Sequence, residues 1–234
     1  MNHAATPEPT TVTTGLVIRT PRRYDFRLWL ASRGREGRFR DEEVRLAGIA
    51  PGDRVLDIGC GTGSLTIAAA RAAGPTGRVV GVEPGIEMIE RARAKARRAG
   101  LPIEFVATAG EALPFPDDAF DVVLLSLVLH QLPSDPLHGT MAEVRRVLAP
   151  GGRLLAVDLG TPIPGQRTVH SRGHGHAGDG AAFSLDRVAL LVDYLGLRVT
   201  AIGPIDFRFR NLEPLRYLLA EAPADEPGPD DAAV

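Results

Sequence analysis

An acidic residue followed by three alternating glycines is the most chemically informative pattern in this sequence. Arg54–Ile58 is a short apolar strand that contains Asp57, and Gly59, Gly61 and Gly63 follow it directly before a predicted helix. Glycines in such a turn allow a ligand to approach the backbone without meeting a Cβ atom. The first turn of the helix leaves N–H groups unpaired. Because ligands of open parallel sheets bind at the carboxyl ends of strands, this turn is predicted to bind a ligand.

Three kinds of ligand compete for the glycine turn. A phosphate loop of the Walker type needs a lysine at the start of the helix, and the segment has none. A dinucleotide fingerprint needs its third glycine where Ser64 stands, and a diphosphate would be repelled by Asp57. S-adenosylmethionine carries a sulfonium and an ammonium group and no phosphate, so a carboxylate at Asp57 favours it, directly or through water. The residue types therefore favour S-adenosylmethionine.

A second acidic residue ends the next predicted strand. Glu83 stands in the sequence Gly81-Val82-Glu83-Pro84, 20 positions after Gly63. A carboxylate at that strand tip can accept hydrogen bonds from both hydroxyls of a ribose. The order strand, aspartate, glycine turn, helix, strand and glutamate therefore indicates a nucleoside ligand. The alternative is an ordinary turn with a surface glutamate.

Strands and helices alternate regularly around these residues. The strands are nearly continuous apolar runs, which is typical of a parallel sheet covered by helices on both faces, so the pattern predicts an α/β fold. The predicted strands are Arg54–Ile58, Arg78–Val82, Ile103–Val106, Phe120–Leu125, Arg153–Asp158, Leu197–Ile205 and Leu215–Ala220. The predicted helices are Pro21–Ser32, Glu36–Ala47, Ser64–Ala73, Gly85–Ala99, Pro136–Leu148 and Ser184–Leu195, the last capped by Ser184.

The ends of the chain differ in composition from its middle. Residues 1–14 and 222–234 are polar and rich in proline, so both are predicted to be disordered tails. Residues 15–50 are predicted to form a helical cap, and residues 51–221 to form the ligand-binding domain. The aromatic residues of the cap are expected either to form a wall of the substrate pocket or to pack the cap onto the core; they are Tyr24, Phe26, Trp29 and Phe39.

Composition excludes several classes of protein. The 234 residues carry a formal charge of −2, which argues against a dedicated nucleic-acid binder. The basic end of the predicted helix Gly85–Ala99, with Arg91 and Lys95, is expected to be a solvated helix face. Cys60 is the only cysteine, so no intramolecular disulfide forms and a reducing compartment is favoured. No apolar run approaches the ~20 residues of a spanning helix, and residues 1–14 lack the layout of a signal peptide. We expect a cytoplasmic monomer or homodimer.

Longer motifs extend the pattern from about Arg54 to Gly160. Beside the glycine turn, the chain contains RRYD over 22–25, LPFPD over 113–117, FDVV over 120–123 and LAPGG over 148–152. With these motifs the sequence resembles the class I S-adenosylmethionine-dependent methyltransferases, and among them the quinone and sterol methyltransferases. The resemblance implies a Rossmann-like three-layer sandwich with a mostly parallel seven-stranded sheet of order 3-2-1-4-5-7-6 and an N-terminal helical extension.

The resemblance also implies a set of cofactor contacts. The glycine turn and Asp57 would line the methionine moiety, Glu83 would hold the ribose, and Tyr24 would reach the carboxylate end of the cofactor. The sequence departs from the family at Ala109, where an acidic residue commonly accepts from the adenine amino group; Glu111 is the alternative acceptor. The implied cofactor-binding residues are Tyr24, Asp57, Gly59, Cys60, Gly61, Gly63, Glu83, Pro84, Met88, Ala109, Gly110, Glu111 and Ser126.

The family resemblance implies a reaction as well as a cofactor. A methyl group would pass from S-adenosylmethionine to a small hydrophobic or aromatic acceptor, such as a quinol, a polyketide or a lipid, and S-adenosylhomocysteine would be the product. His130, after the fourth predicted strand, is either a general base or substrate contact, or a histidine held by a backbone bond. Asp158, at the tip of the fifth strand, either contacts substrate or merely closes the strand. Two other functions stay open: a cofactor-binding protein without transferase activity, and an enzyme that uses this fold for another reaction.

Residues 160–180 are rich in glycine and histidine. His170, His174, His176 and Asp179 have the side-chain types of metal ligands. The glycines between them increase the conformational entropy that the segment would lose on becoming ordered. No second cluster of ligand side chains completes a site. A loop over the substrate is therefore favoured, and no metal is predicted.

Overall fold

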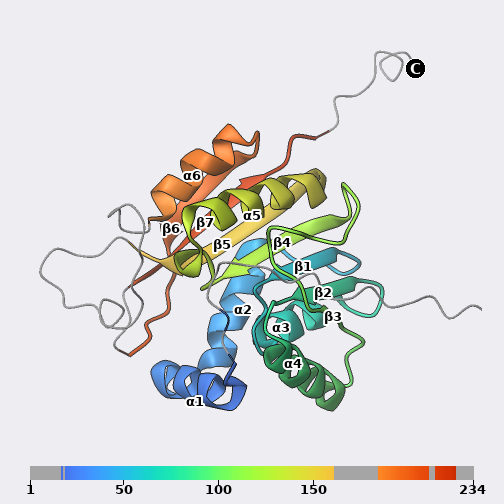
Figure 1. Cartoon of the computed structure of the whole chain (residues 1–234), viewed down its shortest axis with the longest axis vertical. Helices are drawn as coiled ribbons and strands as arrows, with labels where there is room; N and C mark the ends of the chain where they lie inside the picture. The colour runs from blue at the N-terminus through green and yellow to red at the C-terminus, as the bar shows by residue number, and fades with distance from the viewer. Residues whose placement is uncertain (1–16, 18, 161–183, 211–213, 225–234) are drawn as a thin grey trace, which may run out of the picture.

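Seven strands form one sheet between two layers of helices in the computed structural model of the chain (Figure 1). The structure describes residues 17, 19–160, 184–210 and 214–224. The strands are β1 (Arg54–Ile58), β2 (Arg78–Val82), β3 (Glu104–Val106), β4 (Phe120–Ser126), β5 (Leu148–Leu159), β6 (Arg198–Pro204) and β7 (Leu215–Glu221). The helices are α1 (Pro21–Ser32), α2 (Glu36–Ala47), α3 (Ser64–Ala73), α4 (Ile86–Ala99), α5 (Ser134–Val147) and α6 (Leu185–Tyr194), with a 3₁₀ turn η1 (Leu129–Gln131).

The strand order is β3-β2-β1-β4-β5-β7-β6, which confirms the predicted fold class. The first five strands of that order are parallel, and β7 pairs antiparallel with both β5 and β6. In the central strands β1 and β4 almost every residue is buried, as a sheet covered on both faces requires. This order brings the carboxyl ends of β1, β2 and β4 together at one edge.

Alternate residues of each central strand pack against different helices. Leu56 and Ile58 of β1 share a core cluster with Met141 of α5. Val55 shares another cluster with Phe39 of α2 and with α3. Accordingly, α5 and α6 cover one face of the sheet, and α2, α3 and α4 cover the other (Figure 1).

The fifth strand differs from its prediction. It begins at Leu148, five residues before the predicted start at Arg153, because Leu148 already pairs with Phe120 before the pairing resumes at Arg153 and Val122. The Pro-Gly-Gly segment between them is held by the end of β7: the Gly151 N–H donates to Pro223 O, and the Ala222 N–H donates to Gly152 O. The segment interrupts the pairing register and leaves the strand continuous.

The two N-terminal helices fall where they were predicted. Phe39 of α2 is fully buried, with its ring 5.2 Å from that of Phe207 and 5.0 Å from that of Phe209, so the connection between β6 and β7 packs onto α2. Phe26 and Trp29 of α1 are exposed, so the alternative that they pack the cap onto the core is wrong. The alternative that they form a wall of the substrate pocket stays a prediction. The predicted cap of α6 is confirmed, since the Ser184 hydroxyl accepts from the Asp186 N–H.

Several predictions concern residues that are not described. Residues 1–14, most of 222–234 and the histidine-rich segment with His170, His174, His176 and Asp179 lie outside the described ranges. Among the helices that are described, none is both long enough and apolar enough to cross a membrane.

Candidate functional site

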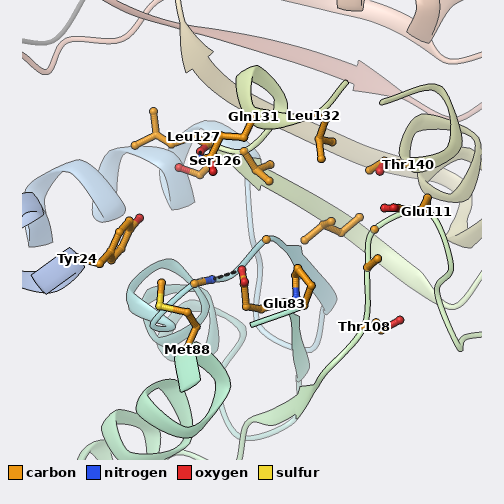
Figure 2. Close-up of a pocket in the computed structure, with 17 residues that line it drawn as sticks. Tyr24, Glu83, Met88, Thr108, Glu111, Ser126, Leu127, Gln131, Leu132 and Thr140 are labelled. Carbon is orange, nitrogen blue, oxygen red and sulfur yellow. Dashed lines mark hydrogen bonds between the residues drawn. The ribbon is translucent and has the colours of Figure 1, made fainter. Parts of the chain in front are cut away.

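A pocket opens at the carboxyl ends of β1, β2 and β4 (Figure 2). Ten of the predicted cofactor-binding residues line it: Tyr24, Gly59, Gly61, Glu83, Pro84, Met88, Ala109, Gly110, Glu111 and Ser126. The remaining lining residues were not predicted: Ile58, Thr108, Leu127, Val128, Gln131, Leu132 and Thr140. The pocket therefore combines an acidic end at β2 with an apolar wall after β4.

The glycine turn needs glycine for two separate reasons. All three alternate glycines have positive φ angles, 71° at Gly59, 54° at Gly61 and 79° at Gly63, where other residues are strained. A Cβ atom at Gly59 would stand 2.6 Å from Cγ2 of Val128, so the turn fits closely against the segment after β4. Gly61 instead faces the pocket, where Met88 and Tyr24 are its nearest side chains.

Glu83 is fixed at the tip of β2 by two backbone donors. Its Oε2 accepts from the Gly61 N–H at 3.3 Å (Figure 2). Its Oε1 accepts from the Gly85 N–H at 3.0 Å. Burial raises the pKa of the Glu83 carboxyl, and these two N–H groups oppose the rise. Each carboxylate oxygen has a second lone pair, so the side chain can still accept from a ligand in the pocket.

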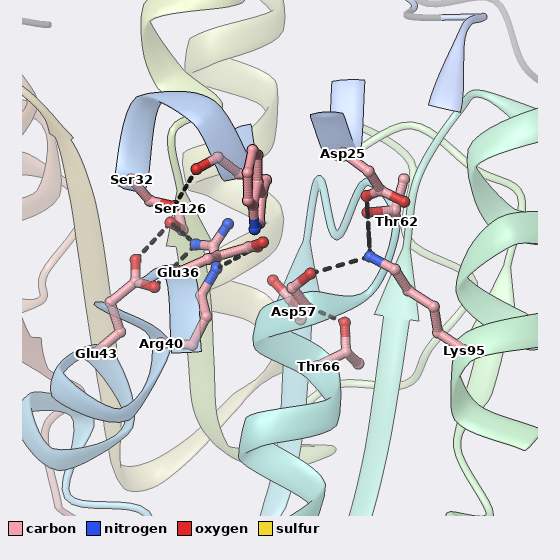
Figure 3. Close-up of polar contacts among 12 residues, drawn as sticks. Asp25, Ser32, Glu36, Arg40, Glu43, Asp57, Thr62, Thr66, Lys95 and Ser126 are labelled. Atoms are coloured by element: carbon pink, nitrogen blue, oxygen red, sulfur yellow. Dashed lines mark hydrogen bonds and ion pairs between the residues drawn. The ribbon is translucent and has the colours of Figure 1, made fainter. Parts of the chain in front are cut away.

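Asp57 lies beneath the turn and does not line the pocket. Its side chain is buried, and its Oδ2 accepts from the Thr66 hydroxyl of α3 at 2.6 Å (Figure 3). Burial raises the pKa of Asp57 to about 7, although the Thr66 hydrogen bond and the nearby Arg40 charge act in the other direction. The carboxyl group is therefore able to respond to a positive charge brought into the pocket.

Helix α1 is attached to the glycine turn by a network of charges around Asp25 (Figure 3). Lys95 of α4 lies 2.9 Å from Asp25 Oδ1 and 2.8 Å from Thr62 Oγ1, and Arg91 lies 2.9 Å from Asp25 Oδ2. The prediction of a solvated basic face on α4 is thus wrong for Arg91 and Lys95. The network positions the adjacent Tyr24 with its ring in the pocket.

A second polar cluster joins α2 to the end of β4, and it was not predicted. Arg40 Nη1 donates to Glu43 Oε2 and to Ser126 Oγ, each at 2.9 Å, and the Ser126 hydroxyl donates to Glu43 Oε1 (Figure 3). The Glu43 and Arg40 side chains are buried, and Glu36 lies 3.5 Å from Arg40 Nε. Desolvation raises the pKa of Glu43 despite its cationic partner. The cluster fixes Ser126 at the pocket wall.

Three predicted site residues besides Asp57 lie off the pocket wall. Gly63 packs against α4, where a Cβ would stand 2.9 Å from that of Ala92. Cys60 is buried among the residues of α4 and β3, and burial raises the pKa of its thiol well above the ordinary value, so it is not a nucleophile at neutral pH. His130 lies in η1, where its Nδ1 is 2.6 Å from Asp158 Oδ1.

Asp158 holds His130 through the side chain and the backbone together. Its Oδ2 accepts from the His130 N–H at 3.2 Å, and its Oδ1 also accepts from the Leu159 N–H at 2.7 Å. The Asp158 side chain is fully buried. A carboxylate beside Nδ1 favours the tautomer with the proton on that nitrogen, so Nε2 is the basic atom of the ring. Positioning of His130 is therefore one function of Asp158.

Several known methyltransferases are similar to this chain in sequence. Residues 55–152 match the family described as "Methyltransferase domain". The chain is 36% identical over 143 residues to a ubiquinone/menaquinone biosynthesis C-methyltransferase UbiE of Enterobacter sp. (strain 638), covering 60% of this chain and 56% of that protein. These matches agree with the resemblance of the sequence motifs to the class I S-adenosylmethionine-dependent methyltransferases. The chain spans about half the length of the curated relatives that it matches.

Solved structures share the fold of this chain. A SAM-dependent methyltransferase from Aquifex aeolicus aligns with a TM-score of 0.66 and 21% identity, covering 86% of this chain and 97% of that chain. The [4+2]-cyclase SpnF aligns with a TM-score of 0.66 and 20% identity, covering 80% of this chain and 81% of that chain. At these identities the likeness concerns the fold alone.

The far end of the pocket is where this chain departs from the methyltransferases that it resembles. Ala109 lines the pocket and offers no side-chain acceptor, whereas Glu111 lines it as well and carries a carboxylate. Thr108 is a further lining residue, and its hydroxyl donates to Ala112 O at 2.9 Å. No set of three or more metal-ligating side chains gathers anywhere in the described part of the chain.

Proposed function

We propose that this chain transfers a methyl group from S-adenosylmethionine to a small apolar acceptor of the quinol type and releases S-adenosylhomocysteine. The observation that carries the proposal is the Glu83 carboxylate, which the backbone N–H groups of Gly61 and Gly85 hold at the acidic end of the pocket. Its lining position suits the two hydroxyls of a ribose. The match of residues 55–152 to a methyltransferase domain supports the same cofactor.

The residues of the pocket fit the cofactor along its length. Gly61 offers a wall without a side chain, Met88 and Pro84 offer apolar contacts for the nucleoside, and Glu111 offers an acceptor for the adenine amino group. Tyr24 lies across the pocket from Glu83, at the end proposed for the methionine moiety (Figure 2). Asp57 lies beneath the turn, and its carboxylate attracts the positive charges of that moiety from there.

The chemistry requires alignment and exclusion of water more than acid–base groups. The cofactor, when bound, supplies a methyl group on a sulfonium, which is already a good leaving group. The chain contributes an apolar wall at Leu127, Val128 and Leu132, which keeps water from the reacting centre. We assign His130, held by Asp158, as the base that takes a proton from the acceptor.

The acceptor class follows from the apolar wall and from the relatives. The related proteins of Enterobacter and Symbiobacterium thermophilum are named as C-methyltransferases of ubiquinone and menaquinone biosynthesis and as a demethylmenaquinone methyltransferase. A quinol ring is apolar and loses a hydroxyl proton as it becomes a carbon nucleophile, which gives a base a defined task. The single cysteine supports the reducing compartment of the cytoplasm as the place of reaction.

A second function is supported by one comparison. The fold of the chain is shared with a [4+2]-cyclase, so catalysis of a reaction other than methyl transfer is the alternative, beside binding of the cofactor without any reaction.

Incubation with methyl-labelled S-adenosylmethionine and a reduced benzoquinone or naphthoquinone lacking the ring methyl group separates these functions. We expect label in the quinol and one S-adenosylhomocysteine released for each methyl group transferred. Tight binding of the cofactor with no transfer to quinol, phenol or lipid acceptors would contradict the proposal and favour a binding protein. Conversion of an acceptor with the cofactor left intact would favour the other enzyme class.

Replacing Asp57 by Asn is expected to stabilise the unliganded protein and to weaken cofactor binding. Because burial raises the Asp57 pKa from 3.8 to about 7, the folded state disfavours the ionised carboxylate. This unfavourable contribution is absent below pH ~4 and grows as pH rises to about 7. The free energy of unfolding of the variant should therefore exceed that of the parent by on the order of 1–3 kcal/mol at pH 8 and by little at pH 4. Asn retains an acceptor for Thr66.

Thermal unfolding at both pH values measures the first effect of the Asp57 variant, and titration calorimetry measures the second. Affinity of the parent for S-adenosylmethionine should rise between pH 6 and pH 8, with release of a proton on binding below pH 7. The affinity of the variant should be about tenfold lower at pH 8 and independent of this titration. Unchanged affinity would remove Asp57 from the cofactor site.

A further inference from the structure

We propose that the outer face of α1 docks on the surface of an anionic lipid bilayer. Phe26, Trp29 and Leu30 are 61%, 56% and 49% exposed, although they are large apolar residues. They stand at i, i+3 and i+4 and so share one face of the helix. The rings of Phe26 and Trp29 stack with their centroids 6.1 Å apart, which makes the face continuous.

Arginines surround this apolar face. Arg22 stands one turn before Phe26, Arg33 follows Leu30 by three residues, and Arg23 and Arg27 lie between; all four are exposed. Residues 19–40 contain eight arginines and two acidic residues, a net charge of +6, whereas the rest of the chain sums to −8. The positive charge is thus concentrated in the segment that carries the apolar face.

The two acidic residues of this segment do not neutralise the outer face. Asp25 points inward to Arg91 and Lys95 of α4, and Glu36 lies beside the buried Arg40. The inner side of α1 is occupied by the protein itself, where Tyr24 lines the pocket and Leu28 is in the core. The helix therefore has one side bound to the protein and one basic, aromatic side that is exposed.

This combination favours a lipid surface over other partners. Helices that lie in a bilayer interface carry Trp, Phe and Leu on one side and arginine or lysine around them, because the rings enter the acyl boundary while the cations meet anionic headgroups. A second copy of the chain would bring like charges together at such a face. An RNA would use the arginines and leave the aliphatic Leu30 unexplained.

A comparison within the molecule shows what the charges add. Leu190 and Tyr194 of α6 are 74% and 85% exposed and also share a helix face. The charged residues of α6 are Asp186, Arg187 and Asp193, so that face lacks a basic surround. It lies at the opposite end of the molecule from α1 (Figure 1). The α6 pair is therefore a matched control for an apolar surface without complementary charge.

The single tryptophan of the chain provides a direct measurement, since Trp29 belongs to the proposed docking face. The full chain is mixed with vesicles of phosphatidylcholine alone or with 30% phosphatidylglycerol, and Trp29 emission and co-sedimentation are recorded. We expect a blue shift, quenching by brominated acyl chains and sedimentation with the anionic vesicles only, all weakening as salt is raised. None of these readouts needs the cofactor or the proposed reaction.

Variants separate the contributions of rings and charges. We expect Phe26→Ser with Leu30→Ser, and separately Arg22→Gln with Arg23→Gln and Arg27→Gln, to weaken binding to anionic vesicles at least tenfold. Leu190→Ser with Tyr194→Ser should change it less than twofold, and thermal unfolding checks that each variant is folded. Equal loss in the α6 variant, or no binding by the parent at low salt, would overturn the proposal. A concentration-dependent blue shift without vesicles would assign the face to a second copy instead, and retention of RNA in place of vesicles would assign it to nucleic acid.

Discussion

Replacing Glu83 by Ala is expected to weaken binding of S-adenosylmethionine by about 100-fold, close to 3 kcal/mol. The carboxylate is buried and oriented by the Gly61 and Gly85 N–H groups, so it is already positioned for two ribose hydroxyls before the ligand arrives. Removing it also leaves these two backbone donors without their acceptor. Titration calorimetry with S-adenosylmethionine and with S-adenosylhomocysteine measures the loss, and both should be affected equally because they share the ribose.

Glu90 provides the matched control for Glu83, because it is an exposed carboxylate on the neighbouring helix α4. Glu90→Ala should bind the cofactor as the parent does. Glu83→Gln should fall between the parent and Glu83→Ala, since the amide keeps one acceptor oxygen. An affinity that stays within threefold of the parent in a folded Glu83→Ala variant would contradict the assignment of the acidic end of the pocket to the ribose.

Replacing His130 by Asn is expected to lower kcat by about 100-fold on a quinol acceptor while leaving cofactor affinity unchanged. The reason is that the His130 ring is oriented by Asp158 at 2.6 Å and lies directly after the pocket residues that end β4. Initial rates measure the first effect, and titration calorimetry with S-adenosylmethionine measures the second.

His138 on α5 is the control for this experiment, because it is an exposed histidine whose Nδ1 contacts Ser134 O. His138→Asn should have the rate of the parent. Asp158→Asn should lower kcat less than His130→Asn, since it alters the tautomer and position of the ring without removing it. If His130→Asn lowers the melting temperature and leaves kcat intact, the histidine is structural.

The fold and the acidic end of the site could be predicted because local patterns encode them. The apolar runs of β1 and β4 require a sheet that is covered on both faces. The glycine turn and Glu83 at the tip of the next strand indicate a nucleoside ligand at this edge of the sheet. The position of β7 between β5 and β6 followed from resemblance to a family. Hydrophobic periodicity alone does not give the order of the strands in the sheet.

The side-chain network of the cap could not be predicted, because it joins residues that are far apart in the sequence. Arg40 and Glu43 are separated from Ser126 by more than 80 residues, and charged residues in a helix are usually solvated. One signal was present: Glu36, Arg40 and Glu43 share a helix face beside the apolar Phe39. Charged residues on the buried face of a helix indicate an internal ion pair.

Two other predictions failed for a common reason. Lys95 was predicted to face solvent and is a partner of Asp25, whereas Trp29 is exposed and does not pack on the core, which was one of its two predicted positions. In each case the type of residue was taken to determine its environment. The placement of α1 against α4 decides both, and that placement depends on tertiary contacts that sequence periodicity does not contain.

The Asp25 network makes the attachment of α1 accessible to a simple chemical measurement. Lys95 is the only lysine in the chain, and its ammonium contacts Asp25, Thr62 and Ser64 with 22% of the side chain exposed. An acylating reagent modifies the free amine only when these contacts open. The labelling rate at this one position, followed by mass spectrometry, therefore reports how often α1 separates from the glycine turn, and saturating S-adenosylhomocysteine should slow it.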